Sequence, residues 1–241
     1  MESPWLIALS RQVTLRREMD VVANNIANVN TPGYKAERML FSEYLVKPQK
    51  DVSLTFVEDK GMIRDMREGQ LTKTGNTLDL ALSGDGFFLV ETEGGQRLTR
   101  SGRFQLDAGG QIVNQLGHPV LSAAGQSIII PPDTTDIGIA PDGVVSADTT
   151  VVGRIGVVNV DNPRAMRREA NNIYAADEAP APVEGARVLQ GMLEESNVNA
   201  IQEMTNMIEV HRAYASNQRA LQDEHDRMRR AIRQIIGNSG T

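Results

Sequence analysis

The sequence NAIQEMTNMIEVHRAYASNQRALQDEHDRMRRAIRQII, residues 199–236, contains neither proline nor glycine and decides the fold class. Asn199 can cap a helix, and Gln202 follows at the spacing of a capping box. Two columns of residues repeat every seven positions, and the second is apolar only at its ends. The first column is Ala200, Met207, Tyr214, Leu221, Met228 and Ile235, and the second is Met204, His211, Gln218, His225 and Ile232. This heptad pattern predicts a helix of about 57 Å that ends at Gly237 and packs on a partner helix like a coiled coil.

The N-terminal segment supplies a candidate partner. Ser3 followed by Pro4 is a favourable helix start, and apolar residues then recur at threes and fours to about residue 28. These apolar residues are Trp5, Ala8, Leu15, Met19, Val22 and Ile26, with Gln12 as a polar member of the same row. A turn at Thr31-Pro32-Gly33 ends the pattern. We expect a helix of about 39 Å.

The middle of the chain consists of short β-rich runs separated by turn residues. We expect strands over residues 78–83, 86–92, 97–106, 111–114, 127–130, 143–146 and 151–160. Such spacing is typical of an antiparallel β domain. The predicted fold is therefore α+β, with paired long N- and C-terminal helices, coiled-coil-like, flanking a central antiparallel β domain. We expect five segments: an N-terminal helix (1–34), an extended connector (35–72), the β domain (73–178), a linker (179–197) and a C-terminal helix (198–241). Both helices are expected to belong to the core of an assembly with other molecules.

Composition excludes several classes of function. The chain has 241 residues, a net charge of -6, no cysteine and 4% aromatic residues. The absence of cysteine rules out disulfides, thiolate nucleophiles and cysteine-ligated metal centres. The missing basic surplus argues against nucleic-acid binding. No apolar run is long enough to span a bilayer, and the N-terminus lacks the pattern of a cleavable signal, so we expect neither membrane insertion nor a cleaved leader.

No group of residues forms a recognisable catalytic or metal-binding motif. His211 and His225 share a helix face but lie about 21 Å apart, too far to hold one metal ion. Glu194 and Glu195 are expected on a solvated face, because no nucleophile or electrophile accompanies them. We therefore expect no cofactor, no metal and no enzymatic activity. The alternative is an enzyme that acts on the cell wall through a pocket in the β domain.

An asparagine-rich run at the end of the first helix has two interpretations. It reads as a helix C-terminus followed by a turn, or as a polar seam in which Asn24, Asn25 and Asn28 bridge neighbouring helices. Two helices alone cannot enclose their apolar stripes, so the exposed surface indicates an interaction with other molecules. Contacts that do not close into a ring would build a helical filament.

Three segments together resemble one protein family. They are residues 23–35 (ANNIANVNTPGYK), residues 75–82, 84–88 and 99–104 in the middle, and residues 195–199 with Arg212-Ala213-Tyr214 near the end. This order is similar to that of the bacterial flagellar rod and hook proteins. The length and the single compact β region look most like the proximal-rod members, with a distal-rod or hook subunit as the alternative.

The resemblance implies a structural role and a set of partners. It implies that both chain ends form the helical core of the periplasmic rod in the flagellar basal body and transmit torque. The partners would be other copies of the chain, other rod subunits and the flagellar type III export apparatus, which passes the unfolded chain without a cleaved signal. The residues expected at the assembly interface are Asn24, Asn25, Asn28, Thr31, Gly33, Tyr34, Asn197, Asn199, Met207, Tyr214 and Leu221.

The sequence predicts that the terminal helices are marginal without partners, because isolated helices are weakly stable in water. Limited proteolysis of the dilute, monomeric protein should remove both ends and leave a resistant fragment near residues 73–178, identified by mass spectrometry. Full protection of both termini in a dilute monomer would contradict this prediction.

Overall fold

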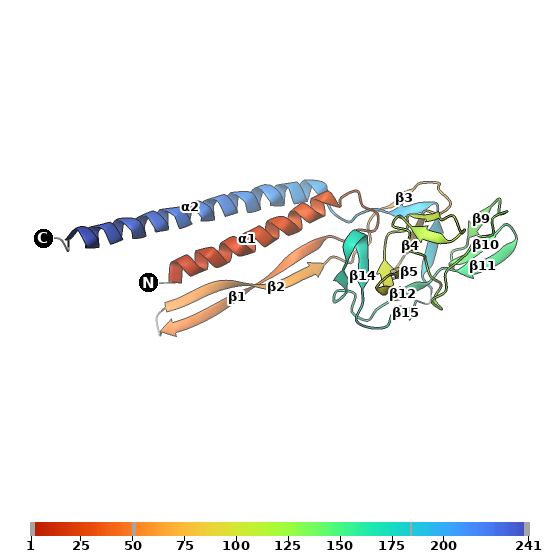
Figure 1. The fold of residues 1–241 in the computed structure, drawn as a ribbon, viewed down its shortest axis with the longest axis horizontal. Coiled ribbons are helices and arrows are strands. Elements are labelled where there is room, and N and C mark those ends of the chain that lie inside the picture. The colour runs from red at the N-terminus through yellow and green to blue at the C-terminus, as the bar shows by residue number, and fades with distance from the viewer. Residues whose placement is uncertain (1–2, 50–51, 184, 239–241) are drawn as a thin grey trace. The chain divides into compact units, whose positions relative to one another are not determined.

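The computed structural model describes residues 3–49, 52–183 and 185–238, in two compact units. The helical unit comprises Met1–Ala27, Glu37–Arg64 and Asn199–Thr241, and the β unit comprises Asn28–Ala36 and Asp65–Val198. In chain order (Figure 1), the elements are α1 (Ser3–Ala27), β1 (Glu37–Gln49), β2 (Val52–Arg64), β3 (Leu71–Lys73), β4 (Leu80–Ser83), β5 (Phe87–Thr92), β6 (Gly95–Thr99), β7 (Phe104–Leu106), β8 (Ile112–Asn114), β9 (Ile137–Ile139), β10 (Val144–Ala147), β11 (Thr150–Arg154), β12 (Val157–Asn159), β13 (Arg167–Arg168), the 3-10 turn η1 (Ala170–Asn172), β14 (Ile173–Ala175), β15 (Ala181–Pro182), β16 (Arg187–Gln190), β17 (Met192–Glu194) and α2 (Ala200–Asn238).

Both predicted terminal helices are present. The α1 helix begins at Ser3, as its cap pattern predicts. The α2 helix begins after Asn199, whose Oδ1 accepts hydrogen bonds from the backbone N–H groups of Ile201 and Gln202, both at 3.1 Å. The predicted stop at Gly237 is wrong, because α2 continues to Asn238. Gly237 does not adopt the left-handed conformation that a terminating glycine needs.

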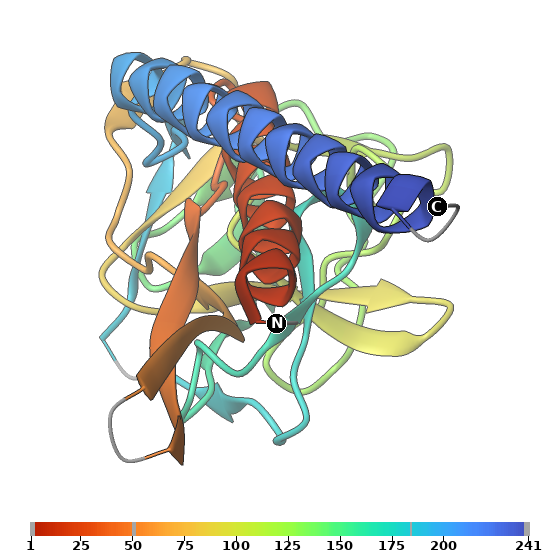
Figure 2. The ribbon, with the colours of Figure 1, turned by 90° about the vertical axis from the view of Figure 1, so that its left-hand side faces the viewer.

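The helical unit has three layers. The α1 helix packs between α2 on one side and the antiparallel β1–β2 pair on the other (Figures 1 and 2). The β1–β2 pair starts with Glu37 opposite Arg64. We expected residues 35–72 to form an extended connector, but residues 37–49 and 52–64 form a two-stranded antiparallel sheet instead. Pairing within the sheet satisfies backbone groups that an extended connector would leave to solvent.

The β unit is antiparallel throughout its described strands. Its largest sheet has the order β13-β14-β6-β5-β12-β15, accompanied by the three-stranded sheet β11-β10-β9 and the pairs β16-β4, β17-β3 and β7-β8. Two apolar clusters fill it. One surrounds Phe88 and Phe104, whose rings meet edge to face at 5.2 Å, and the other surrounds Phe87 and Tyr174. The predicted central antiparallel β region is thus confirmed.

Several predicted strand boundaries are wrong. The expected strand 97–106 is split into β6 and β7, because the chain at Gly102 runs against β4. A Cβ atom on Gly102 would lie 1.6 Å from the Leu80 carbonyl oxygen. Residues 127–130 make only isolated bridges. Residues 179–197 were expected to be a linker, yet they contain β15, β16 and β17. Val188 and Leu193 of this segment are buried, so it belongs to the packed β unit.

Candidate assembly surface

The seam between α1 and α2 follows a heptad, but with a different second column from the predicted one. The predicted column containing Met207, Tyr214 and Leu221 is half-buried. The column that accompanies it is Glu203, Val210, Asn217 and Glu224, which alternates with the first at spacings of four and three. The other predicted column, Met204, His211, Gln218 and His225, is exposed. Sequence reasoning missed the correct column because three of its four members are polar.

Polar contacts align the two helices. Gln12 Nε2 donates a hydrogen bond to the Tyr214 hydroxyl at 3.3 Å, and Asn217 Nδ2 donates to the Ala8 carbonyl at 2.8 Å. The first contact explains why Gln12 is the polar residue in the apolar row of α1. Among the side chains of this unit whose burial is described, the buried apolar ones are Leu15, Val22 and Val210.

Each helix presents an exposed apolar ladder with the same spacing. On α1 the ladder is Leu6, Leu9 and Val13, and on α2 it is Ile201, Met204 and Ile208, where Ile201 has 79% of its surface exposed. Burying one such side chain contributes about 1.5–3 kcal/mol. These ladders are surface that an assembly could bury.

Asn25 joins α1 to the start of β1. Its Oδ1 accepts a hydrogen bond from the Glu37 N–H at 3.0 Å, and its Nδ2 donates to the Glu37 carbonyl at 2.8 Å. Arg64, opposite Glu37 in the sheet, donates to the Glu37 carboxylate at 3.1 Å. Only 1% of Asn25 is exposed. The structure therefore gives this amide a role inside the chain, where the sequence suggested a bridge between helices.

A buried ion cluster lies in the β unit. The Glu194 carboxylate accepts hydrogen bonds from Lys35 Nζ at 2.7 Å, from Arg100 Nε at 2.6 Å and from the Gly69 N–H at 3.0 Å. The three charged side chains are at most 4% exposed. The expectation of a solvated Glu194 is wrong. It holds for Glu195, which is exposed.

The cluster includes a second carboxylate and several backbone carbonyls. Arg100 Nη2 also donates to the Glu68 carboxylate at 3.2 Å, and the Glu68 side chain is 42% exposed. Arg100 also donates to the carbonyls of Gly86 and Gly84, and Lys35 donates to the Arg67 carbonyl at 2.7 Å. Burial opposes ionisation of Glu194, but the nearby Arg100 and Lys35 charges outweigh it and hold its pKa below the usual range. Burial also lowers the pKa of Lys35, against the attraction of Glu194.

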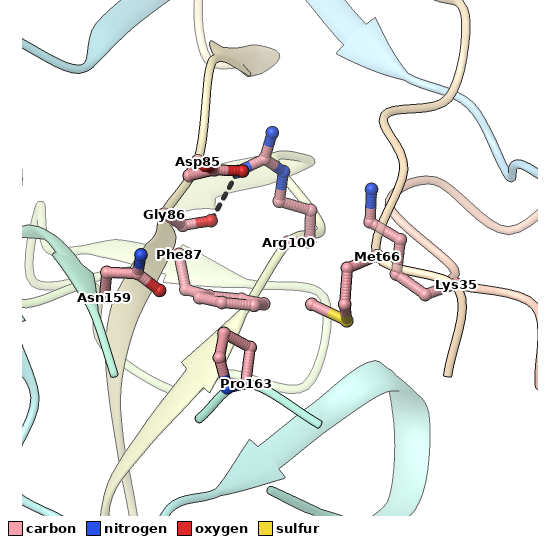
Figure 3. Close-up of a pocket in the computed structure, with 8 residues that line it drawn as sticks. All are labelled: Lys35, Met66, Asp85, Gly86, Phe87, Arg100, Asn159 and Pro163. Atoms are coloured by element: carbon pink, nitrogen blue, oxygen red, sulfur yellow. Dashed lines mark hydrogen bonds between the residues drawn. The ribbon is translucent and has the colours of Figure 1, made fainter. Parts of the chain in front are cut away.

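A small pocket of about 130 Å³ adjoins this cluster. Figure 3 shows it lined by Lys35, Arg100 and Asp85 with the apolar side chains of Phe87, Met66 and Pro163. Pockets for small-molecule substrates usually measure about 300–1,000 Å³. Lys35 and Arg100 are already engaged by Glu194. The pocket therefore gives no support to the alternative of an enzyme acting through the β domain.

The remaining predicted interface residues also make contacts within their own unit. Asn197 Oδ1 accepts a hydrogen bond from the Ala36 N–H, and Asn197 Nδ2 donates hydrogen bonds to the carbonyls of Asp65 and Arg67. These bonds hold three segments of the chain together. Tyr34 is buried, with the Arg168 guanidinium 5.4 Å from its ring centre. The Thr31 hydroxyl donates to Asn28 Oδ1 at 3.1 Å. Asn24 and Asn28 are half-buried, and Asn199 is exposed.

Gly33 is required by its surroundings. It has a φ of +67°, and its N–H donates to the Glu194 carbonyl at 2.7 Å. A Cβ atom there would lie 2.4 Å from the Arg100 backbone.

No sequence signal marked Lys35, Arg100 or Glu194 as a group, because they are far apart in the chain.

No helix in the described parts of the chain is long and apolar enough to cross a bilayer. Among the described residues, no cluster of three or more histidine, aspartate or glutamate side chains could hold a metal ion.

We predict that Glu194→Gln lowers the free energy of unfolding by about 3–5 kcal/mol, because it leaves the buried Lys35 without its paired carboxylate and Arg100 with only the more exposed Glu68. Urea denaturation checks this. Glu195→Gln, its exposed neighbour, is the matched control and should change stability by less than about 1 kcal/mol. Equal effects of the two substitutions would refute the role of the cluster.

The same cluster predicts acid sensitivity. The lowered pKa of Glu194 means that its stabilisation is complete above the unfolded-state value of about 4.3 and is lost as pH falls through the folded-state pKa. Denaturation at a series of pH values should show stability falling below about pH 4.3. In Glu194→Gln, the free energy of unfolding should fall less steeply with decreasing pH, because the variant lacks the titrating carboxyl group.

The two asparagines of the helix-terminal run should behave differently. Asn25→Leu leaves two buried backbone groups of Glu37 unpaired, at about 1–3 kcal/mol each, and should destabilise the helical unit of the monomer. Asn28→Leu, at a half-buried site, should cost much less. Hydrogen exchange of the Glu37 amide is the measurement, and equal protection in both variants would contradict the assigned contact.

Three family models match the chain. A flagella basal body rod protein model covers residues 6–35, a flagellar hook protein FlgE/F/G D1 domain model covers residues 81–147, and a flagellar basal body rod FlgEFG protein C-terminal model covers residues 189–234. The first covers most of α1 and the loop after it, the second lies inside the β unit, and the third covers the end of β16, all of β17 and most of α2.

Whole-length relatives agree with these models. The chain is 41% identical to the flagellar basal-body rod protein FlgF of Caulobacter vibrioides, over 98% of each chain. It is 34% identical to FlgF of Rhizobium meliloti, over 99% of this chain and 100% of that one. It is 32% identical to the rod protein FlgG of Buchnera aphidicola, over 90% of this chain and 93% of the other. The chain belongs to the flagellar basal-body rod protein family, whose members are structural proteins and not enzymes.

Proposed function

We propose that this rod-family protein is a FlgF-type subunit of the proximal rod and polymerises through its terminal helices into the drive shaft. The observation that carries this proposal is the pair of exposed apolar ladders on α1 and α2, in a chain whose 41% and 34% identical relatives are named FlgF. The ladders would be buried between subunits, where each side chain adds hydrophobic stabilisation.

Torque transmission needs subunits that do not deform under load. In the β unit, the buried ion cluster and the Asn197 contacts fix the segments around Lys35, Arg100 and Glu194. In the helical unit, the α1–α2 seam and the Asn25–Glu37 contact fix the two helices and the sheet. Load entering the exposed helix faces would pass through these contacts.

The assembly contacts we propose are therefore shifted from the predicted ones. We propose that the main contacts between subunits are made by the two exposed apolar ladders, which consist of Leu6, Leu9 and Val13 on α1 and of Ile201, Met204 and Ile208 on α2. Asn24, Asn28 and Thr31, which are half-buried, stay candidates at the rim. Asn25, Gly33, Tyr34 and Asn197 act indirectly, because they hold each unit in shape.

The proposal includes the route and place of the protein. It would leave the cytoplasm unfolded through the flagellar type III apparatus, without a cleaved signal, and join the rod in the periplasm with other rod subunits. Absence of cysteine suits a chain that enters an oxidising space unfolded, because no free thiol can mispair. A distal-rod position is the second candidate, since FlgG proteins match at 31–32% identity.

Deletion and imaging test this function. Cells lacking the protein should be non-motile, and their basal bodies should lack the proximal rod in electron cryomicroscopy. A gold-labelled tag inserted in the exposed turn at Glu93 and Gly94 should mark the proximal rod. The control is a complemented strain that carries the tagged protein: if this strain is motile, the tag does not disrupt rod assembly. Label on the distal rod or the hook, or motility without the protein, would overturn the proposal.

A further inference from the structure

The α2 helix extends past the start of α1. The antiparallel seam pairs Gln12 with Tyr214 and Ala8 with Asn217. Trp5 lines a hollow with α2 residues that reach only as far as Asp226. Residues 227–238 therefore overhang α1 by about 18 Å, as Figure 1 shows at the C-terminal end.

The overhang is a basic helix. Residues 227–238 contain four arginines, Arg227, Arg229, Arg230 and Arg233, and no acidic residue. Arg227 pairs with Glu224 at 2.6 Å. The other three are exposed and have no carboxylate partner in the described chain. Met228 lies among them with 42% of its surface exposed.

The opposite end of the helical unit carries an acidic groove. It has a volume of about 550 Å³ and lies between the end of α1, the start of α2 and the start of β1. Glu18, Glu203 and Glu209 line it, and none has an ion-pair partner among the described residues. Val21, Val22 and Val210 form its apolar part. Its lining also contains the cation Arg38 and Glu37, which pairs with Arg64.

Two features indicate that the groove is prepared for a cation. Glu203 is 7% exposed, an unusual position for a carboxylate without a partner. Burial also raises the pKa of Glu18, an effect that a cation placed in the groove would oppose. An arginine in the groove would supply the missing charge, and its stem would cover the valines.

We propose that the arginine-rich overhang of one copy, residues 227–238, seats in the acidic groove of the next copy. This inference rests on the proposed polymerisation. The groove at Asn206 and the overhang at Arg230 are about 36 Å apart along one straight helix, so they cannot meet within a chain. The contact is heterologous, and repeated it builds an open chain of staggered subunits. Charge complementarity sets its direction and register.

Disulfide cross-linking tests the contact, because the natural chain contains no cysteine. The double variant Val21→Cys with Met228→Cys places one thiol in the groove and one on the overhang. Oxidation of isolated basal bodies carrying this variant should yield a ladder of covalent multimers of this chain. The control, Val21→Cys with Ile129→Cys, uses an exposed site in the β unit and should yield no ladder.

Charge reversal adds a second readout. Arg229→Glu with Arg230→Glu, placed in the cross-linking background, should lower the multimer yield by about tenfold or more, because like charges then meet. Adding Glu209→Arg, at an exposed site on the groove, should recover much of the yield. Circular dichroism of the monomers checks that the helices are unchanged.

The outcomes separate this inference from the proposed function. A multimer ladder that the arginine reversal weakens supports the contact. A protein that localises to the rod but gives no ladder, or cross-links only to a different rod protein, overturns the contact and leaves the proposed function standing. If the purified protein cross-links into multimers but imaging does not find it in the rod, the contact is supported and the proposed function is contradicted.

Discussion

The structure depends on the buried carboxylate of Glu194, held between Lys35 and Arg100. A buried ion is tolerated only when counter-charges and hydrogen bonds replace its water, so all three side chains must arrive together. They come from the loop after α1, from the bend between β6 and β7, and from the end of β17. Gly33 fits this arrangement closely, since its N–H reaches the Glu194 carbonyl and the Arg100 backbone leaves no room for a side chain.

The two units are stabilised in different ways. The β unit encloses two apolar clusters, and its buried Lys35, Arg100 and Glu194 side chains are paired with one another in the ion cluster. The helical unit leaves two apolar ladders exposed on α1 and α2 and uses polar contacts to align its helices. Exposed apolar ladders gain stabilisation when an assembly buries them, whereas the β unit already has the core of an independent domain. This division suits a subunit whose helices face its neighbours.

Much of the fold could be predicted from local patterns, and the failures have local causes. Helix limits followed from Ser3 and Asn199, because caps act on adjacent backbone groups. The β1–β2 pair was not predicted, because its register depends on pairing across the chain and on the Asn25–Glu37 contact. The strand 97–106 was predicted as continuous because nothing local reveals that Leu80 lies against Gly102. The heptad column at Glu203, Asn217 and Glu224 was missed because a polar seam lacks an apolar signal.

The sequence by itself determined the two terminal helices, the antiparallel β region between them, the excess of apolar helix surface and the likeness to flagellar rod proteins. These follow from periodicity, capping and motif order, which act over short stretches of chain. Only the tertiary structure decided that Glu194 is buried while Glu195 is exposed, that Asn25 serves its own chain, and that α2 overhangs α1 beyond Asp226. Adjacent residues share a local pattern but not an environment, and burial, pairing and overhang depend on segments far apart in sequence that only folding brings together.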